Sequence, residues 1–167
     1  MNASHIDAFE FCRLKQSQAG EDLVANFPRL SAEIATKDGS VHWSVEGSVN
    51  EQGYSQLILK VASDVHLMCQ RCLTPFVHRL ESASVLVLAP DEASADEFER
   101  LIDDDAIDVI VAAQPLSIAD LVEDEALLLL PQSPRHQECP RPALEAVPAQ
   151  LKDKAPSPFD VLKNWKQ

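Results

Sequence analysis

The sequence predicts an α+β domain in which an antiparallel β-meander carries one long helix packed on it. Apolar and polar residues alternate over residues 41–49, further strand-like runs follow after short turns, and a later segment repeats apolar residues at helical spacing. Short connections between successive strands favour antiparallel neighbours. With 46% hydrophobic and 25% charged residues among 167, the composition excludes collagen-like, coiled-coil and wholly disordered chains.

Four strands of the meander are expected in the first half of the chain. Val41, Trp43 and Val45 alternate with polar neighbours, as in a half-buried strand. Turn-like residues separate the following runs, and we expect the chain to reverse at Ser63 and Asp64. The expected strands cover residues 41–49, 54–62, 65–69 and 76–88. The last strand ends with apolar residues on both parities, so we expect that end either to be covered on both faces or to carry a bulge.

Further elements surround these strands. The first thirty residues suggest short elements that pack on the sheet, and residues 107–111 suggest a strand that returns to the sheet edge. A helix is expected from Ile118 up to the stop at Pro131, lying across the sheet, with Ser117 capping its first turn. Its solvated face is expected to hold Asp120, Glu123 and Asp124.

The acidity of the chain is concentrated in one segment. The formal net charge is −13, but residues 91–125 hold thirteen of the 27 acidic residues and a single basic one, Arg100. Few large apolar residues accompany the acidic ones in 91–105, so we expect a flexible acidic loop there. Three roles stay open for this loop: a solubilising insertion, a docking surface for a basic protein, or a divalent-metal site.

The expected domain boundary lies near residue 139. Residues 1–139 are assigned to a single α+β domain, and residues 140–167 to a proline-rich tail, since seven of the eleven prolines lie beyond residue 130. Within the tail, residues 159–165 can form a short helix with one apolar face. This segment either folds back onto its own domain or docks on a partner. Its apolar face consists of Phe159, Leu162 and Trp165.

No segment predicts a membrane association. The longest uninterrupted apolar run, residues 126–130, is too short to span a bilayer, and the N-terminus lacks the basic start and apolar core of a signal peptide. We therefore expect a soluble protein in the cytoplasm, without a small-molecule substrate.

Four cysteines in a cytosolic chain favour a metal site over a disulfide framework. A Cys-x-x-Cys knuckle lies between two expected strands, and a His-x-x-Cys pair follows the expected helix. Two such pairs can hold one tetrahedral zinc ion, which would tie the later loop to the sheet. The candidate ligands of this structural zinc are Cys69, Cys72, His136 and Cys139.

Other interpretations of the cysteines stay open. They include reduced thiols that only pack, a redox dithiol at Cys69 and Cys72, and a regulatory disulfide. His66 or His78 could replace His136 as the ligand. Basic residues gather around the same knuckle and suggest an RNA contact, although they could be ordinary surface arginines. The candidate RNA-binding residues are Arg71, Arg79, Arg135 and Arg141.

Taken together, the motifs resemble those of a known family. They are the Cys-x-x-Cys segment 69–76, the acidic and apolar helix 121–131, Pro134-Arg135-His136 with Cys139, and the closing run 158–162. In this order they resemble the YceD family, the large ribosomal RNA subunit accumulation proteins of bacteria, with relatives in chloroplasts. The resemblance spans residue 65 to the C-terminus. It implies a role in the synthesis, processing or stability of large-subunit ribosomal RNA, without an established catalytic activity.

The leading functional hypothesis is a non-enzymatic ribosome biogenesis factor that supports the accumulation of 23S rRNA. Its partners would be large-subunit rRNA or its precursor, a basic ribosomal protein, or both. The first alternative is a chaperone-like binder of one basic ribosomal protein. The second is a nuclease or thiol-redox enzyme, against which stands the absence of HExxH, P-loop and GxSxG patterns and of histidines near the clustered carboxylates. We accordingly predict no catalytic residues.

Overall fold

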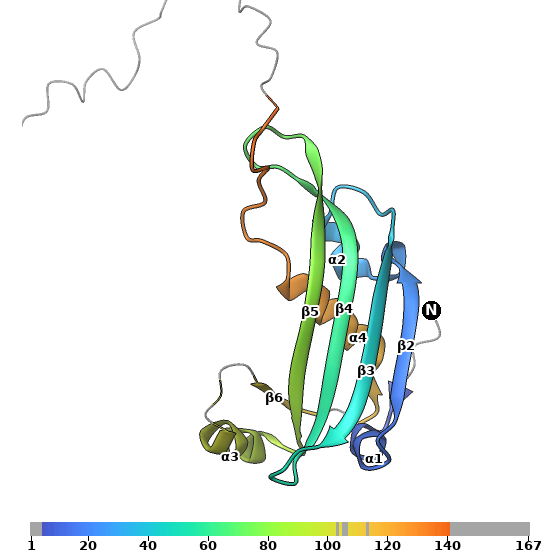
Figure 1. The fold of residues 1–167 in the computed structure, drawn as a ribbon, viewed down its shortest axis with the longest axis vertical. Helices are drawn as coiled ribbons and strands as arrows, with labels where there is room; N and C mark the ends of the chain where they lie inside the picture. Colours follow the sequence, from blue (N-terminus) through green and yellow to red (C-terminus); the bar gives the residue numbers. More distant parts are fainter. Residues whose placement is uncertain (1–4, 103, 105–106, 113, 141–167) are drawn as a thin grey trace, which may run out of the picture. The chain divides into compact units, whose positions relative to one another are not determined.

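The structure, a computed structural model, describes residues 5–102, 104, 107–112 and 114–140. The chain divides into two compact units, residues 1–137 and residues 138–167. All helices and strands described below belong to the first unit. The predicted α+β class is confirmed, since helices pack on a sheet that is mostly antiparallel (Figure 1).

The main sheet has five strands in the order β2-β3-β4-β5-β6. Strands β2 to β5 follow one another as antiparallel neighbours, and β6 pairs with β5 in parallel. A separate two-stranded sheet joins β1 (His5–Ile6) to β7 (Leu116–Ser117). The strands of the main sheet are β2 (Ser17–Leu23), β3 (Ser40–Val49), β4 (Ser55–Met68), β5 (Pro75–Ala89) and β6 (Ile107–Val111).

The turn expected at Ser63 and Asp64 is wrong, because β4 runs unbroken through both residues. Ser63 pairs with Leu80 and Asp64 with Arg79 in the ladder to β5. The buried face of β4 continues its alternation through Ser63, whose hydroxyl donates to the Ser40 carbonyl at 2.8 Å. A serine with a backbone partner therefore occupies a core position that its polarity alone would not predict.

The predicted helix across the sheet is α4 (Ile118–Leu128), which Figure 1 draws behind β3 to β5. Its N-cap is confirmed, since the Ser117 hydroxyl accepts from the Asp120 amide at 3.3 Å. Apolar residues of α4 enter the core on the face of the sheet that β4 buries. The helix has 11 residues, the same number as α3 (Glu92–Ile102), so it is not distinctively long.

Glu123 does not belong to the solvated face of α4, where it was expected. It is only 4% exposed, and its carboxylate accepts from the backbone amides of Arg29 at 2.7 Å and Leu30 at 3.1 Å. These amides open the first turn of helix α2 (Pro28–Glu33). The Arg29 guanidinium adds a third bond from Nε at 2.9 Å. Glu123 is thus a buried cap that joins α4 to α2.

Glu125 is also buried on α4, and it faces the sheet. Its Oε1 accepts from the hydroxyls of Ser82 at 2.5 Å and Ser84 at 2.7 Å, both on β5. Two hydroxyl donors satisfy a carboxylate oxygen that would be costly to bury alone. Glu125 therefore fixes the position of α4 over β5.

The acidic segment is not the loop that was expected over 91–105, because residues 92–102 form helix α3. Asp91 caps it: its carboxylate accepts from the Ser94 amide at 2.8 Å, and this bond lowers the pKa of Asp91. Ala95 is buried, and the Phe98 ring lies 4.2 Å from that of Tyr54, centroid to centroid. A few apolar contacts and a cap thus stabilise the helix despite the repulsion among its acidic residues, which had suggested a loop.

Helix α3 also explains the end of β5. It contacts both β5 and β6 and forms the crossover that a parallel strand pair requires. Residues 86–89 of β5 are all buried, so the predicted covering of both faces is confirmed. The strand predicted over 107–111 is confirmed as β6 at the sheet edge.

The N-terminal residues pack on the sheet as expected, and they also extend it through β2. Helix α1 (Ala8–Arg13) approaches β3 at Gly47, where a β-carbon would lie 2.7 Å from the Phe11 carbonyl oxygen. A short turn of 3-10 helix, η1 (Val24–Asn26), leads from β2 to α2. In the described part of the chain, no helix is long and apolar enough to cross a membrane.

Candidate metal centre

The predicted Cys-x-x-Cys knuckle is the loop between β4 and β5, residues 69–74. The Cys69 amide donates to the Thr74 carbonyl at 3.1 Å, and the Leu73 amide donates to the Cys69 carbonyl at 2.9 Å. Leu73 adopts a left-handed backbone with φ of 57°. This tight turn brings the two cysteine side chains of the loop close to each other.

The segment after α4 docks on this loop through backbone and side-chain hydrogen bonds. The Gln70 amide donates to the Pro134 carbonyl at 2.9 Å, and the Ser133 hydroxyl donates to the Gln70 side-chain oxygen at 2.9 Å. In Figure 1 this segment rises from α4 along the sheet toward the β4–β5 loop. The docking positions His136 at the knuckle, 64 residues beyond Cys72.

The imidazole of His136 lies among the thiols of the knuckle. Its Nδ1 is 3.3 Å from the Cys72 Sγ, and its ring centroid is 4.8 Å from that of Phe76. The ligand atoms of Cys69, Cys72 and His136 all lie within 4.8 Å of one another. A tetrahedral zinc ion, with Zn–S of about 2.3 Å, places its ligand atoms slightly under 4 Å apart. Small shifts would bring these three side chains to that spacing.

The electrostatics of the centre favour a thiolate beside a positive charge. Burial raises the pKa of the Cys69 thiol, but backbone hydrogen bonds from Cys72, His136 and Arg71 outweigh it and lower the pKa to about 5. Hydrogen bonding to Cys69 raises the pKa of His136. A metal cation would take the place of the imidazole proton, because only a deprotonated ring nitrogen can bind it.

The remaining cysteines differ from these two. Cys12 is fully buried in α1, where its thiol donates to the Gln56 carbonyl at 3.2 Å and burial raises its pKa. Cys139, the fourth predicted ligand, belongs to the second unit. The candidate ligand group contains His136 and neither of the alternatives His66 and His78.

The predicted RNA-binding arginines occupy different surroundings. Arg71 is exposed in the knuckle loop, and Arg135 lies in the segment docked on that loop, where it donates to the Ser133 hydroxyl at 3.1 Å. Arg79 lies on β5 and pairs with Glu81 at 2.9 Å, which raises the pKa of Arg79. Arg141 and the expected helix at 159–165 lie outside the described residues.

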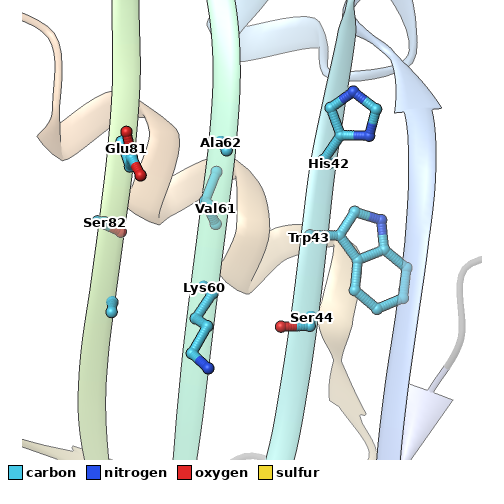
Figure 2. Close-up of a pocket in the computed structure, with 9 residues that line it drawn as sticks. His42, Trp43, Ser44, Lys60, Val61, Ala62, Glu81 and Ser82 are labelled. Carbon is cyan, nitrogen blue, oxygen red and sulfur yellow. The ribbon is translucent and has the colours of Figure 1, made fainter.

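A second candidate site is a hollow of about 540 Å³ on the face of the sheet opposite α4 (Figure 2). His42 on β3, Lys60 on β4 and Glu81 on β5 line it. Ala62 pairs with both His42 and Glu81, so the histidine and the carboxylate stand two strands, or about 10 Å, apart. This separation is too large for a direct proton transfer between them.

Sequence reasoning missed the burial of Glu123 and the docking of the segment after α4. Glu123 lies among acidic neighbours, so its composition suggested solvent. Nothing in the local sequence indicates the bond from Gln70 to Pro134. The helical spacing of Glu125 with apolar residues was the one available signal for a buried carboxylate.

A sheet whose hairpin loop carries a Cys-x-x-Cys, with a histidine segment docked on it after α4, defines an α+β protein with a candidate metal centre. A family model described as "Large ribosomal RNA subunit accumulation protein YceD" matches residues 57–166. The chain belongs to this family.

A curated relative from Haemophilus influenzae (strain ATCC 51907 / DSM 11121 / KW20 / Rd) is named "Large ribosomal RNA subunit accumulation protein YceD". It is 33% identical to the chain over 113 residues, which are 65% of this chain and 63% of the relative. The match thus covers less than two thirds of the relative's own length. No solved structure matches the chain significantly.

Proposed function

We propose that this protein is a non-enzymatic factor in ribosome biogenesis that supports the synthesis, processing or stability of 23S rRNA in the cytoplasm. Membership of the YceD family carries this proposal, because the family and the relative are both named for accumulation of the large ribosomal RNA. Such a name describes a factor that maintains an RNA and does not name a reaction.

One structural zinc ion would hold the knuckle loop and the segment that follows α4 together. The donor set Cys69, Cys72, His136 and Cys139 is compatible with a metal site and has the thiolate and imidazole chemistry that zinc prefers. Cys139 follows His136 by three positions, so their Cα atoms are at most about 11 Å apart. Cys139 can therefore supply the fourth ligand without a long connection.

The knuckle would also form the RNA contact. Arg71 is in the knuckle loop, and Arg135 is in the segment that docks on it, so the metal centre would keep two guanidinium groups at one end of the sheet. Arg141 would add a third. Arg79 is paired with Glu81 and would contribute less. Guanidinium groups bind phosphate oxygens, which are accessible on any exposed RNA backbone.

The distance of the acidic helix α3 from the knuckle supports an RNA contact at the knuckle end of the sheet. β5 begins beside the knuckle and runs 15 residues to its contact with α3, a span of about 50 Å at about 3.3 Å per residue. This distance exceeds the Debye length of about 8 Å several times over. The acidic charge on α3 would therefore not repel RNA bound at the knuckle.

Cosedimentation tests the proposal. The tagged protein should migrate with precursors of the large subunit in a gradient at moderate salt, and cells without it should contain less 23S rRNA. The double variant Arg71→Gln with Arg135→Gln should lose most of the particle-bound fraction, whereas Arg13→Gln, an exposed arginine on α1, should behave as wild type. Normal 23S rRNA levels in cells without the protein would refute the proposal.

A second candidate function is binding of a basic ribosomal protein, which the exposed acidic side chains of α3 favour. Pull-down with and without nuclease treatment separates the two candidates. Capture of one ribosomal protein that survives the nuclease and is lost in Asp96→Asn with Glu97→Gln would favour protein binding. Maturation of precursor RNA by the purified protein alone would instead point to an enzyme.

A further inference from the structure

Strand β6 forms one edge of the main sheet, and Figure 1 shows it beside the end of β5. It pairs with β5 in parallel along its whole length of five residues. Among the described residues, no strand pairs with its other side. We call the side of β6 that faces away from β5 the open edge. Such an edge presents backbone N–H and C=O groups that a further strand can bind.

The backbone amides of Val109 and Val111 point toward the open edge. The Ala112 amide donates to the Ala89 carbonyl on β5 at 2.9 Å. Because the backbone groups of successive residues alternate between the two sides of a strand, the Ile110 amide also points to β5, and those of Val109 and Val111 point away from it. A change at the Val109 amide therefore removes no hydrogen bond between β5 and β6.

The side chains of β6 give the open edge little protection against pairing. Four of its five residues are Ile or Val, the fifth is Asp108, and Val111 is 37% exposed. Natural proteins protect unpaired edges with lysine, proline, bulges or inward charges, and β6 carries a single charge. By contrast, β2 at the opposite edge contains Gly20 followed by Glu21 and Asp22. The composition of β6 is thus the more favourable one for an added strand.

The surroundings of the open edge are strongly acidic. Helix α3 contacts β6, and its exposed side chains include Asp96, Glu97 and Glu99. Residues 91–112 contain nine acidic residues and one basic residue, Arg100. A field of this sign attracts segments rich in lysine and arginine and repels polyanions such as RNA. The charge therefore favours a basic protein over a nucleic acid at this edge.

The same charge disfavours a second copy of this chain. Pairing of β6 with its counterpart in another molecule would bring two acidic α3 helices to one interface. Like charges that meet across an interface cost free energy and suppress such pairing. The occupant that fits both the backbone and the charge is an extended segment with lysine or arginine on its flanks.

We propose that the open edge of β6 binds an extended segment of a basic ribosomal protein as an additional strand. Backbone hydrogen bonds with Val109 and Val111 would provide the attachment, and basic side chains would pair with the carboxylates of α3. This inference rests on the second candidate function, binding of a basic ribosomal protein, and specifies the site and the mode of binding.

The variant Val109→Pro tests this mode, because proline removes an amide that points away from β5. The control is Ala19→Pro on β2. The Val24 amide donates to the Gly39 carbonyl at 3.1 Å, so by the same alternation the Ala19 amide points away from β3. Tagged full-length protein is incubated with purified, nuclease-treated proteins of the large ribosomal subunit. Wild type and Ala19→Pro should retain one basic protein, and Val109→Pro should retain at least about tenfold less of it.

Hydrogen exchange detected by NMR gives a second measurement, which uses the wild type alone. The Val109 and Val111 amides should exchange at least about tenfold more slowly when the retained protein is bound. Unchanged exchange, or full retention by Val109→Pro, would overturn the inference and leave the second candidate function standing. A wild-type dimer that dissociates in Val109→Pro would also overturn it, because the occupant would then be a second copy.

The failure of the inference and the failure of the proposed functions are distinguishable. Retention of no ribosomal protein by the wild type would refute both the inference and the second candidate function. The RNA contact at the knuckle would be unaffected by that result, because cosedimentation tests it separately. Retention of ribosomal RNA by β6, lost in Val109→Pro, would overturn the assignment of a protein to this edge.

Discussion

The imidazole Nδ1 of His136 lies 3.3 Å from the Sγ of Cys72, although 64 residues separate them. This contact joins the loop between β4 and β5 to the segment that follows α4. Cys69 is buried at the same point, and the pKa of its thiol is lowered. The three side chains could therefore bind a metal cation.

Substitution of Cys72 by serine should abolish stoichiometric zinc binding. Loss of the thiolate leaves too few strong ligands, and the segment that carries His136 loses its main attachment. The unfolding midpoint should fall by about 5 °C or more, since 1 kcal/mol corresponds to about 2–4 °C for a chain of this size. Metal analysis and thermal unfolding measure the two effects. Cys12→Ser serves as the control for metal content, and unchanged zinc in Cys72→Ser would contradict the assignment.

Replacement of Glu123 by glutamine should destabilise the fold by about 1–3 kcal/mol. The amide keeps the size of the side chain but removes the negative charge that accepts from the Arg29 and Leu30 amides at the start of α2. Asp124→Asn is the matched control, because this neighbour is 54% exposed. Urea unfolding compares them, and equal losses in the two variants would argue against a special role for Glu123.

Gly47→Ala should destabilise the chain by about 1–3 kcal/mol through overpacking. The new methyl group would lie 2.7 Å from the Phe11 ring, 2.7 Å from the Phe11 carbonyl oxygen and 2.9 Å from the Cys12 Cα. Removing the ring with Phe11→Leu in the same molecule should not restore stability, because two of the three atoms that crowd the new methyl group belong to the backbone. Full recovery in the double variant would show that only the ring opposes the methyl group.

Cys12 should resist alkylation in the native protein. Its thiol is fully buried, and burial raises its pKa above the ordinary 9.0. Mass spectrometry after iodoacetamide treatment near neutral pH should find it modified only once the chain is denatured. Rapid modification of the native protein would contradict the burial of α1 against β3.

The raised pKa of Cys12 also has a consequence for stability. Above pH 9 the unfolded chain loses this proton while the native chain keeps it, so the Cys12 contribution to stability declines as pH rises. Wild type should therefore lose stability faster than Cys12→Ala between pH 9 and the native pKa. Parallel pH profiles of the two proteins would exclude this linkage.

Elements whose signals are local follow from the amino-acid sequence alone. The alternation around Val45, the cap at Ser117 and the Cys-x-x-Cys between two strands each depend on residues a few positions apart, and each of these features is present in the structure. Predictions from local composition were wrong where a residue makes a contact with a partner elsewhere in the chain. Ser63 lies within a strand and donates its hydroxyl hydrogen to the Ser40 carbonyl. Residues 92–102 form a helix whose Phe98 ring packs against the Tyr54 ring.

Tertiary packing selects which charged residues are buried and how the candidate metal ligands meet. Glu123 is an internal cap because α2 begins against α4, and nothing within several residues of it indicates that neighbour. His136 joins Cys72 because the Gln70 amide binds the Pro134 carbonyl. Such contacts depend on the packing of elements far apart in the chain, where geometry and not local propensity selects the partner.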